Sequence, residues 1–412
     1  MDETSGLMTT AEAAIALGVK PATLYAYVSR GVLRSHRLRG RRGSWFDPAE
    51  IDAITGGRGR PSGGLDLAIT TGLTRIDDAG LSYRGRDVLG LSQRASFESV
   101  ASLLWTGQLH HLRFDVPRDI TRAARRATAW LPPEARLADR LGLIVTAAAS
   151  ADRLRFDLSP PAVAASGRLL IGAMVEGLPR LSRSDPPPLV LSDSTAVDPS
   201  IAARLWARLS AGPADEGATV LNGFLVLLAD HELATSTVAA RVAASTRANP
   251  YAAVAAALGT LDGPLHGTVS EEVHALLTRA TGPGGAGAAV SDWLRRDQRV
   301  PGFGHTLYAN GDPRARAALP LLRRLREDPG ARRRLQVVEQ VRRAVNARTP
   351  ASPNSDFCLG ALAFVAAMPA DAGEAIFAIA RTAGWVAHVL EEYGEAPLRF
   401  RARAIYSGQP TR

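Results

Sequence analysis

The 412-residue chain is poor in several residue types, and each shortage excludes a class of protein. It contains a single cysteine, Cys358, so it can form no internal disulfide and no site built from several thiolates. No apolar run reaches the length that spans a bilayer, and the first residues, MDETSGLMTTAEAA, lack the basic and apolar regions of a signal peptide. We therefore expect a cytoplasmic protein that has no contact with a membrane.

Lysine is almost absent as well. Lys20 is the only one, so arginine supplies nearly all of the 49 basic residues, which face 40 acidic residues and give a net charge of +9. A general preference for arginine raises the charge of any protein, so this total does not by itself indicate a nucleic-acid surface, and the local distribution matters more. The hydrophobic share of 46% and the charged share of 22% are ordinary for a soluble globular protein.

Alternating strand patterns are scarce too. The best are LDLAITTGLTRI and LSYRG, between residues 65 and 85, whereas most other segments have helical spacing. In residues 371–394, for example, apolar side chains recur at positions 376, 379, 380, 383 and 386. The chain therefore predicts a mainly α body over residues 65–412, preceded by a compact segment, residues 1–56, and a Gly/Arg/Ser/Pro-rich linker, residues 57–64.

The N-terminal segment is patterned as two short helices joined by a turn. Thr10 can cap a helix over residues 11–17, and Pro21 begins a second helix over residues 22–30. With the arginine-rich hairpin that follows, this resembles the winged helix-turn-helix of MerR-type and excisionase-type DNA-binding proteins. The resemblance implies DNA contacts from Thr23, Tyr25, Arg34, Arg37, Arg39, Arg41 and Arg42. The alternative is a module of this fold that serves only packing or dimerisation.

Three of the eight histidines have unusual neighbours: His231 in LLADHELATST, His266 in LDGPLHG and His305 in VPGFGH. No pair has the spacing of metal ligands, so we expect no metal site. His266 lies between a turn and a predicted helix start, where the helix dipole favours the neutral imidazole. A neutral imidazole can donate a hydrogen bond to a developing enolate oxygen, although an ordinary capping or core histidine is the alternative.

Two charged residues lie in apolar surroundings. Asp356, in PNSDF, either caps the helix that follows or is desolvated beside Phe357 and made more basic. Arg381 interrupts the apolar pattern of IFAIARTAGW and must find an anion, which is either a structural carboxylate or a ligand.

Taken together, these segments resemble the citrate synthase family. The matching stretches follow one another in order: GLSYRGRDVLGLSQRASFESVASLLWTGQL, LLADHELATST, GPLHG with EEV, GFGH with DPRA, PNSDF, FAIARTAGWVAH and RARAIY. The resemblance implies a mostly helical obligate homodimer. It also implies a large domain, residues 65–266 and 376–412, and a small domain, residues 267–375, that close over the substrates.

The family's roles carry over position by position. The resemblance implies that Asp356 removes a proton from the acyl methyl group, His266 holds the enol oxygen and His305 polarises the oxaloacetate carbonyl. Oxaloacetate carboxylates would be bound by His231, Arg314, Arg381 and Arg401, the last from the partner subunit. The main chain of Val300, Pro301, Gly302, Phe303 and Gly304 would lie along coenzyme A. No bound cofactor is implied, since the acyl-CoA is a substrate.

Three functions remain open on the sequence. The first is a citrate synthase that condenses acetyl-CoA with oxaloacetate. The second is a 2-methylcitrate synthase that uses propionyl-CoA, because one methyl group in an apolar pocket changes binding by only about 1–3 kcal/mol. The third is a DNA-binding regulator, in which residues 8–56 bind DNA and the synthase body senses a metabolite.

Overall fold

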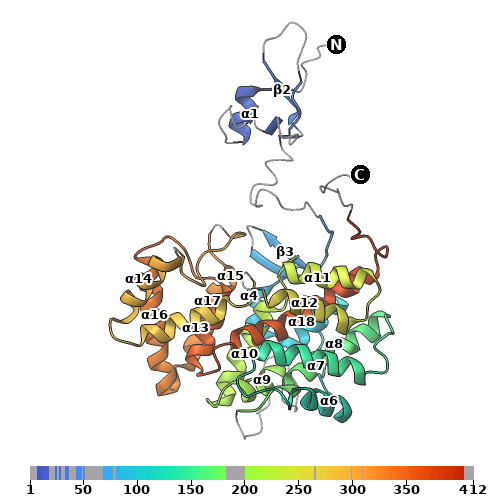
Figure 1. Cartoon of the computed structure of the whole chain (residues 1–412), viewed down its shortest axis with the longest axis vertical. Coiled ribbons are helices and arrows are strands. Elements are labelled where there is room, and N and C mark those ends of the chain that lie inside the picture. Colours follow the sequence, from blue (N-terminus) through green and yellow to red (C-terminus); the bar gives the residue numbers. More distant parts are fainter. Residues whose placement is uncertain are drawn as a thin grey trace, which may run out of the picture. The chain divides into compact units, whose positions relative to one another are not determined.

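The computed structural model describes residues 7–17, 24–25, 27–28, 33–36, 43–48, 50–51, 68–77, 80–181, 200–263, 266–297, 299–308 and 310–402. The chain forms two compact units, Met1–Ile69 and Thr70–Arg412, which are drawn together in Figure 1. The predicted linker, residues 57–64, lies outside the described residues. Each unit has its own hydrophobic core, and the two are taken in turn.

The N-terminal unit begins with strand β1 (Met8–Thr9) and helix α1 (Thr10–Leu17). The predicted cap at Thr10 is one residue late. The main-chain N–H of Thr9 donates to Glu12 Oε2 at 2.8 Å and the N–H of Glu12 donates to Thr9 Oγ1 at 3.3 Å, which is a capping box. The Thr10 hydroxyl donates instead to the carbonyl of Ser44.

The rest of this unit agrees with a helix-turn-helix and a hairpin. Strand β2 (Trp45–Phe46) pairs antiparallel with β1, and an antiparallel bridge joins His36 to Trp45 with N···O distances of 2.8 and 2.9 Å. The bridge lies at the open end of the predicted hairpin. The described residues of the predicted second helix are helical, and the core is formed by Ala13, Ala14, Leu24, Leu33, Phe46 and Ile51.

The second unit opens with a small antiparallel sheet of β3 (Thr74–Asp77), β4 (Gly80–Tyr83) and β5 (Arg86–Asp87). Both segments that the sequence singled out as strands therefore contribute to it. Its first helices are α4 (Val88–Arg94), α5 (Phe97–Thr106), α6 (Arg118–Thr128), α7 (Leu137–Ala151), α8 (Pro160–Gly177) and α9 (Ile201–Leu209). They are followed by α10 (Ala214–Leu228), α11 (Thr235–Ser245), α12 (Pro250–Leu261) and α13 (Val269–Ala280). The chain continues through α14 (Gly285–Asp297), α15 (Pro313–Leu322), the 3-10 helix η1 (Arg323–Glu327), α16 (Pro329–Asn346), α17 (Ser355–Val365) and α18 (Ala372–Tyr393).

Helix α18 is the central element of the second unit. It is buried almost throughout, because most of its residues are Ala, Ile, Val, Gly or Trp, and it packs against α5, α7, α8, α10, α11, α12, α13 and α17. Helices α13, α14, α15, α16 and α17 pack against one another and form the orange side of the unit in Figure 1. The mainly helical architecture is confirmed. The exact division into a large and a small domain stays a prediction.

Candidate active site

The first part of the site is the loop after α10, which contains Asp230 and His231. Tyr83 holds this loop in place: its hydroxyl lies 2.9 Å from the carbonyl oxygen of Asp230 and 3.1 Å from the nitrogen of the same residue. The Oδ2 atom of Asp230 accepts hydrogen bonds from the Thr74 hydroxyl and from His388 Nε2. Because Asp230 is fixed from three directions, the next residue, His231, has a defined position at the end of α10.

His231 forms a cluster of three rings with His305 and Tyr308. Its Nε2 atom lies 2.8 Å from the Tyr308 hydroxyl, and its ring centroid lies 5.7 Å from that of His305. The rings of His305 and Tyr308 are 4.7 Å apart. Burial, assisted by the positive charge of Arg314, holds the pKa of His231 well below the usual histidine value. His231 is therefore neutral at physiological pH.

Two N–H groups point at the ring of His305, that of Leu307 at Nδ1 (3.1 Å) and that of Arg314 at Nε2 (3.3 Å), and a neutral ring can accept from only one of them. We assign the acceptor to Nδ1, where the main-chain hydrogen bond is the shorter of the two, so Nδ1 carries no proton. Burial, followed by the charge of Arg314, lowers the pKa of His305, so the ring is neutral and its proton is on Nε2. Nε2 lies 3.3 Å from a guanidinium nitrogen of Arg314. Two donors thus face one another, and a ligand oxygen could accept from both.

Asp312 holds Arg314 in that position and connects it to the next helix. Its carboxylate accepts from Arg314 Nε at 3.0 Å and Nη2 at 2.8 Å, and also from the main-chain N–H of Ser355 at 2.9 Å. Ser355 is the first residue of α17, so one buried carboxylate fixes both the arginine and the start of α17. Burial alone would raise the pKa of Asp312, but Arg314 lowers it below the usual value.

Asp356 does not cap α17. That role belongs to Asn354, whose Oδ1 accepts from the main-chain N–H groups of Asp356 and Phe357 at 3.0 and 3.2 Å. Among the described residues, the carboxylate of Asp356 accepts no hydrogen bond. Burial raises its pKa to about 6, and the negative charge of Asp312 adds to the effect, although Arg314 and Arg381 oppose it. Of the two interpretations that the sequence left open, the structure favours the desolvated, more basic carboxylate.

The loop Val300–Gly304 packs tightly against this segment. Gly302 has φ +78°, and a Cβ there would lie 2.7 Å from Cα of Phe357, so both the backbone angle and the close approach require glycine. The carbonyl of Gly302 accepts from the N–H of Asn354 at 2.9 Å, and the N–H of Gly304 donates to Ser352 at 2.8 Å. The loop and the start of α17 therefore form one hydrogen-bonded unit that positions His305 and Asp356 together.

His266 lies two residues before Thr268, the N-cap of α13, as the sequence predicted. Its Nε2 is 2.9 Å from the hydroxyl of Ser236 on α11. Burial and then the charge of Arg381 lower its pKa, so the ring is neutral. If Ser236 donates to Nε2, the remaining proton is on Nδ1, which is then available to a ligand. Its ring packs against Phe377, with 6.1 Å between the centroids.

Arg381 belongs to the buried helix α18. Its side chain is 1% exposed, its Nε donates to the carbonyl of Leu228 at 2.9 Å, and its guanidinium lies 4.5 Å from the ring centroid of Phe377. No carboxylate among the described residues lies within 4 Å of it. Burial accordingly lowers its pKa to about 10. Of the two partners that the sequence proposed, a structural carboxylate in direct contact is absent among the described residues, and Asp230 acts on Arg381 only from a greater distance.

The remaining predicted residues are separate from this group. Arg401 is exposed in the C-terminal segment, where its N–H donates to the carbonyl of Leu398. In the N-terminal unit, Tyr25 is half exposed, and the exposed Arg34 contacts Glu50. Thr23, Arg37, Arg39, Arg41 and Arg42 lie outside the described residues. The structure therefore brings six of the predicted side chains together in one group. They are His231, His266, His305, Arg314, Asp356 and Arg381.

Sequence reasoning missed several supporting residues. Tyr308 and Asp312 lie in the same stretch as His305 and Arg314, and Ser236 lies five residues after His231. Tyr308 could have been predicted as a neighbour of the site, because it follows the loop residue His305 by only three positions. Nothing in the sequence indicates that Ser236 contacts a histidine thirty positions further along the chain.

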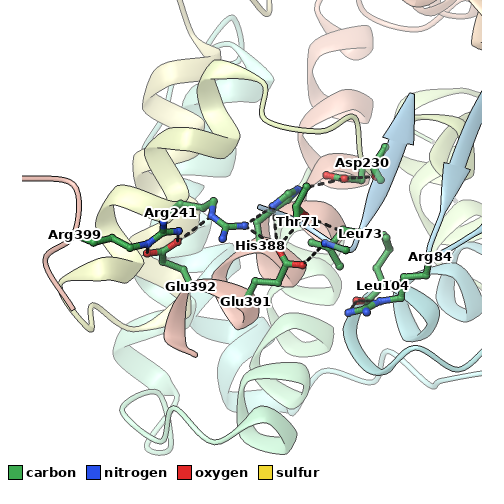
Figure 2. A network of polar contacts seen from close by, with 12 residues as sticks. Thr71, Leu73, Arg84, Leu104, Asp230, Arg241, His388, Glu391, Glu392 and Arg399 are labelled. Atoms are coloured by element: carbon green, nitrogen blue, oxygen red, sulfur yellow. Dashed lines mark hydrogen bonds and ion pairs between the residues drawn. The ribbon is translucent and has the colours of Figure 1, made fainter. Parts of the chain in front are cut away.

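A second polar cluster lies beside the site (Figure 2). Arg241, on α11, donates to Glu391 at 2.8 Å, to Glu392 at 2.9 Å and to His388 Nδ1 at 3.0 Å. Because arginine is only a donor, His388 carries its proton on Nε2 and donates it to Asp230. The two glutamates also hold the segment around Thr71 and the side chain of Arg399. This buried ion network, composed of Arg241, Glu391, Glu392, His388 and Asp230, connects the ends of the unit to the loop of His231.

Comparison with known proteins agrees with this arrangement. The family model described as "Citrate synthase, C-terminal domain" matches residues 65–403. The chain belongs to the citrate synthase family. A model described as "Helix-turn-helix domain" matches residues 7–53, which confirms the predicted type of the N-terminal module. Within the described residues of this family member, no three His, Cys, Asp or Glu side chains are grouped to hold a metal ion, and no helix is long and apolar enough to cross a membrane.

Individual relatives carry both names that the sequence left open. The chain is 30% identical to 2-methylcitrate synthase 2 of Corynebacterium glutamicum, over 81% of this chain and 90% of that protein. It is 29% identical to citrate synthase 2 of Bacillus subtilis, over 83% and 94% of the two chains. Among solved structures, citrate synthase of Thermoplasma acidophilum, in a ternary complex with carboxymethyl coenzyme A and oxaloacetate, matches with a TM-score of 0.67 and 26% identity over 84% of this chain and 96% of that one.

Proposed function

We propose that this protein condenses acetyl-CoA with oxaloacetate to give citrate and free coenzyme A. The observation that carries the proposal is the pair of facing donors, His305 Nε2 and the Arg314 guanidinium, 3.3 Å apart. An α-keto acid offers the acceptors that such a pair needs, because its carbonyl oxygen and an adjacent carboxylate oxygen lie side by side. His305 would then polarise the carbonyl while Arg314 binds the carboxylate.

The unpaired guanidinium of Arg381 would bind the second carboxylate of oxaloacetate, which removes the cost of a buried charge without a counterion. His231, held neutral, would add a hydrogen bond without repelling either arginine. Arg401 would complete the set from a second copy of the chain in a homodimer. This arrangement uses every buried cation of the site to bind a dianionic acceptor.

Proton transfer is the task that we assign to Asp356 and His266. A methyl group beside a thioester is weakly acidic, so its proton is lost only to a well-placed base while a donor holds the enol oxygen. Asp356, with its pKa raised to about 6, would take the proton, and Nδ1–H of His266 would donate to the oxygen. The enol carbon would then form the new bond to the carbonyl carbon, whose oxygen takes a proton from His305. Hydrolysis of the resulting thioester releases coenzyme A.

A 2-methylcitrate synthase, which uses propionyl-CoA, is the alternative for the same machinery. Relatives of either name match this chain almost equally well. We would measure thiol release from acetyl-CoA and from propionyl-CoA, each with and without oxaloacetate. Oxaloacetate-dependent release supports the condensation, and the ratio of the two kcat/KM values decides the acyl group. No release from either thioester would contradict the proposal.

A second function is proposed for the N-terminal unit, namely binding of duplex DNA. The helix-turn-helix match and the accessible Tyr25 and Arg34 favour it. Fluorescence anisotropy of labelled duplex DNA would test it with the full chain and with the variant Arg37→Gln/Arg39→Gln/Arg41→Gln. We expect salt-dependent binding by the natural sequence and a loss of at least tenfold in affinity for the variant. Equal affinities would instead favour a packing or dimerisation module.

A further inference from the structure

Positive charge is concentrated in one segment of the synthase body. Residues 313–348 contain eleven arginines and only three acidic residues, with no lysine or histidine. This segment therefore carries a formal charge of +8, whereas the whole chain carries +9. It comprises helices α15, η1 and α16. A general preference for arginine does not explain so uneven a distribution.

These helices form an open groove of about 730 Å³. It is lined by six arginines and one glutamate, which we call the rim, and by apolar side chains such as Leu319, Leu335 and Val338. The arginines of the rim are Arg316, Arg323, Arg326, Arg332, Arg342 and Arg343. Most of them are exposed, and Arg316, which lies on α15 two residues after the buried Arg314, is among the exposed ones.

The acids of the segment do not neutralise this rim, and the only acid that the structure describes beside Arg326 is the exposed Glu327, at 3.6 Å. Glu339 is shared by Arg342 and Arg343, with N···O distances of 2.7 and 3.2 Å. Among the described residues, Arg316 and Arg323 form no ion pair and no side-chain hydrogen bond. The positive charge is therefore available to a ligand.

The dimensions of the rim favour a chain of phosphates over a single one. Arg332 and Arg343 are eleven residues apart on α16, which corresponds to about 16 Å along the helix axis. A single phosphate is held by donors that converge in an enclosed site, whereas these guanidinium groups are exposed and spread along a groove. Duplex DNA presents phosphates over such a length, and the same chain carries a helix-turn-helix domain.

We propose that the groove of α15, η1 and α16 is a second DNA-binding surface that contacts the phosphate backbone. It would carry no base readout, because exposed arginines on phosphates set affinity and position without reading sequence. The helix-turn-helix would supply the sequence preference, and the groove would strengthen binding of the flanking duplex. Arg314 is not among the residues that line the groove, so this surface can be altered without touching it.

The test compares two triple variants of the full chain that remove the same charge. One is Arg316→Gln/Arg323→Gln/Arg326→Gln in the groove. The matched control is Arg118→Gln/Arg122→Gln/Arg126→Gln on α6, where all three arginines are exposed. Glutamine keeps most of the side-chain length and helix propensity of arginine. Oxaloacetate-dependent thiol release and the melting temperature, measured alongside, show that each variant is folded.

Fluorescence anisotropy of a labelled 30-base-pair duplex is measured from 50 to 300 mM salt. For the groove variant we expect the slope of log K against log salt to fall by about 2 to 3, and the affinity at 100 mM salt to fall at least tenfold. For the α6 variant the slope should change by less than about 1. Unlabelled duplex should displace the probe, whereas polyglutamate of equal total charge should displace it much less.

Four outcomes would overturn the proposal. The first is that the natural chain does not bind the duplex at 50 mM salt, and the second is that the two triple variants lose equal amounts of affinity for it. The third is that the groove variant keeps its affinity for DNA while the Arg37/Arg39/Arg41 variant loses it. The fourth is that polyglutamate displaces the labelled duplex as well as unlabelled duplex does. The last result would indicate an acidic polypeptide as the partner. Because none of these readouts depends on turnover, they leave the proposed condensation reaction untouched.

Discussion

Arg241 and Arg381 are both almost completely buried in the same unit, but their surroundings differ. Arg241 is 0% exposed and is paired with Glu391, Glu392 and His388. Arg381 is 1% exposed and has one carbonyl and one aromatic ring as neighbours, with no carboxylate within 4 Å among the described residues. The cost of burying a charge is met inside the protein in the first case and is left to a ligand in the second.

The same difference separates the two polar clusters as a whole. In the ion network of Figure 2, donors face acceptors and the carboxylates are shared between several partners. In the site, His305 and Arg314 are two donors that face each other, and the Asp356 carboxylate accepts no hydrogen bond from the described residues. Two buried atoms of the network, Arg241 Nη2 and Asp230 Oδ1, have no hydrogen-bond partner among the described residues, but its charged groups are paired with opposite charges. Such charge pairing indicates a structural role, whereas charged groups without a contacting counter-charge indicate a binding or catalytic role.

The largest effect is expected for the substitution Arg241→Leu. It leaves the buried Glu392 and the partly buried Glu391 without their common partner, so the free energy of unfolding should fall by about 3–5 kcal/mol. Urea denaturation of the two proteins measures this loss. The KM for oxaloacetate of the folded fraction should stay within about twofold. A variant as stable as the natural protein would contradict a structural role for the network.

Asp356→Asn should have nearly as large an effect, but on turnover. Asparagine cannot take the methyl proton, and removal of a general base lowers kcat by about 10²- to 10⁴-fold. Because Asn354, not Asp356, caps α17, the melting temperature should not fall. Oxaloacetate binding, followed by calorimetry, should be retained. Turnover within a few-fold of the natural enzyme would exclude Asp356 as the base.

The pH dependence provides a separate test of the same residue. A carboxylate accepts a proton only when it is ionised, so kcat should rise with pH, reach half of its plateau at about pH 6 and level off about one unit higher. The raised pKa also means that folding favours the protonated form, so ionisation of Asp356 reduces stability as the pH rises from about 4 to 6. As the pH rises through that interval, the free energy of unfolding of the natural protein should therefore fall relative to that of Asp356→Asn. A difference that is independent of pH would contradict this.

Part of this contrast could be predicted from the sequence and part could not. The helical body follows from its spacing, and Arg381 is visible as an arginine in an apolar helix, whereas the histidines and Asp356 are assigned to one site by the resemblance to the citrate synthase family. Arg241 is equally buried, but its partners lie about 150 positions away. Tyr308 contacts His231 across 77 positions for the same reason. Sequence patterns show which side chains are unusual, and the fold decides which of them find partners.

Arg381→Leu is expected to act on substrate binding. A charge-assisted hydrogen bond to a carboxylate contributes about 1.5–3 kcal/mol, so the KM for oxaloacetate should rise roughly 10- to 150-fold. Unlike Arg241→Leu, this change removes a buried charge that has no carboxylate within 4 Å among the described residues and is attracted only from further away, chiefly by Asp230, so the melting temperature should be unchanged or higher. Steady-state kinetics and thermal denaturation of the two variants side by side give the comparison. A destabilised Arg381→Leu with unchanged KM would make Arg381 another structural cation.

The smallest effect is expected for Ser236→Ala, which tests whether a paired group can still serve the site. The Ser236 hydroxyl is 2.9 Å from His266 Nε2, and we expect it to donate and so to keep the His266 proton on Nδ1. Loss of one such hydrogen bond corresponds to about 1–1.5 kcal/mol, so kcat should fall roughly 5- to 12-fold, with the KM for oxaloacetate unchanged. Ser236→Thr, which keeps the hydroxyl, should recover most of the rate. A loss of stability with no change in kcat would give Ser236 a structural role like that of the pairs in the ion network. In that case the hydrogen bond would hold Ser236 and His266 together without determining which ring nitrogen of His266 carries the proton.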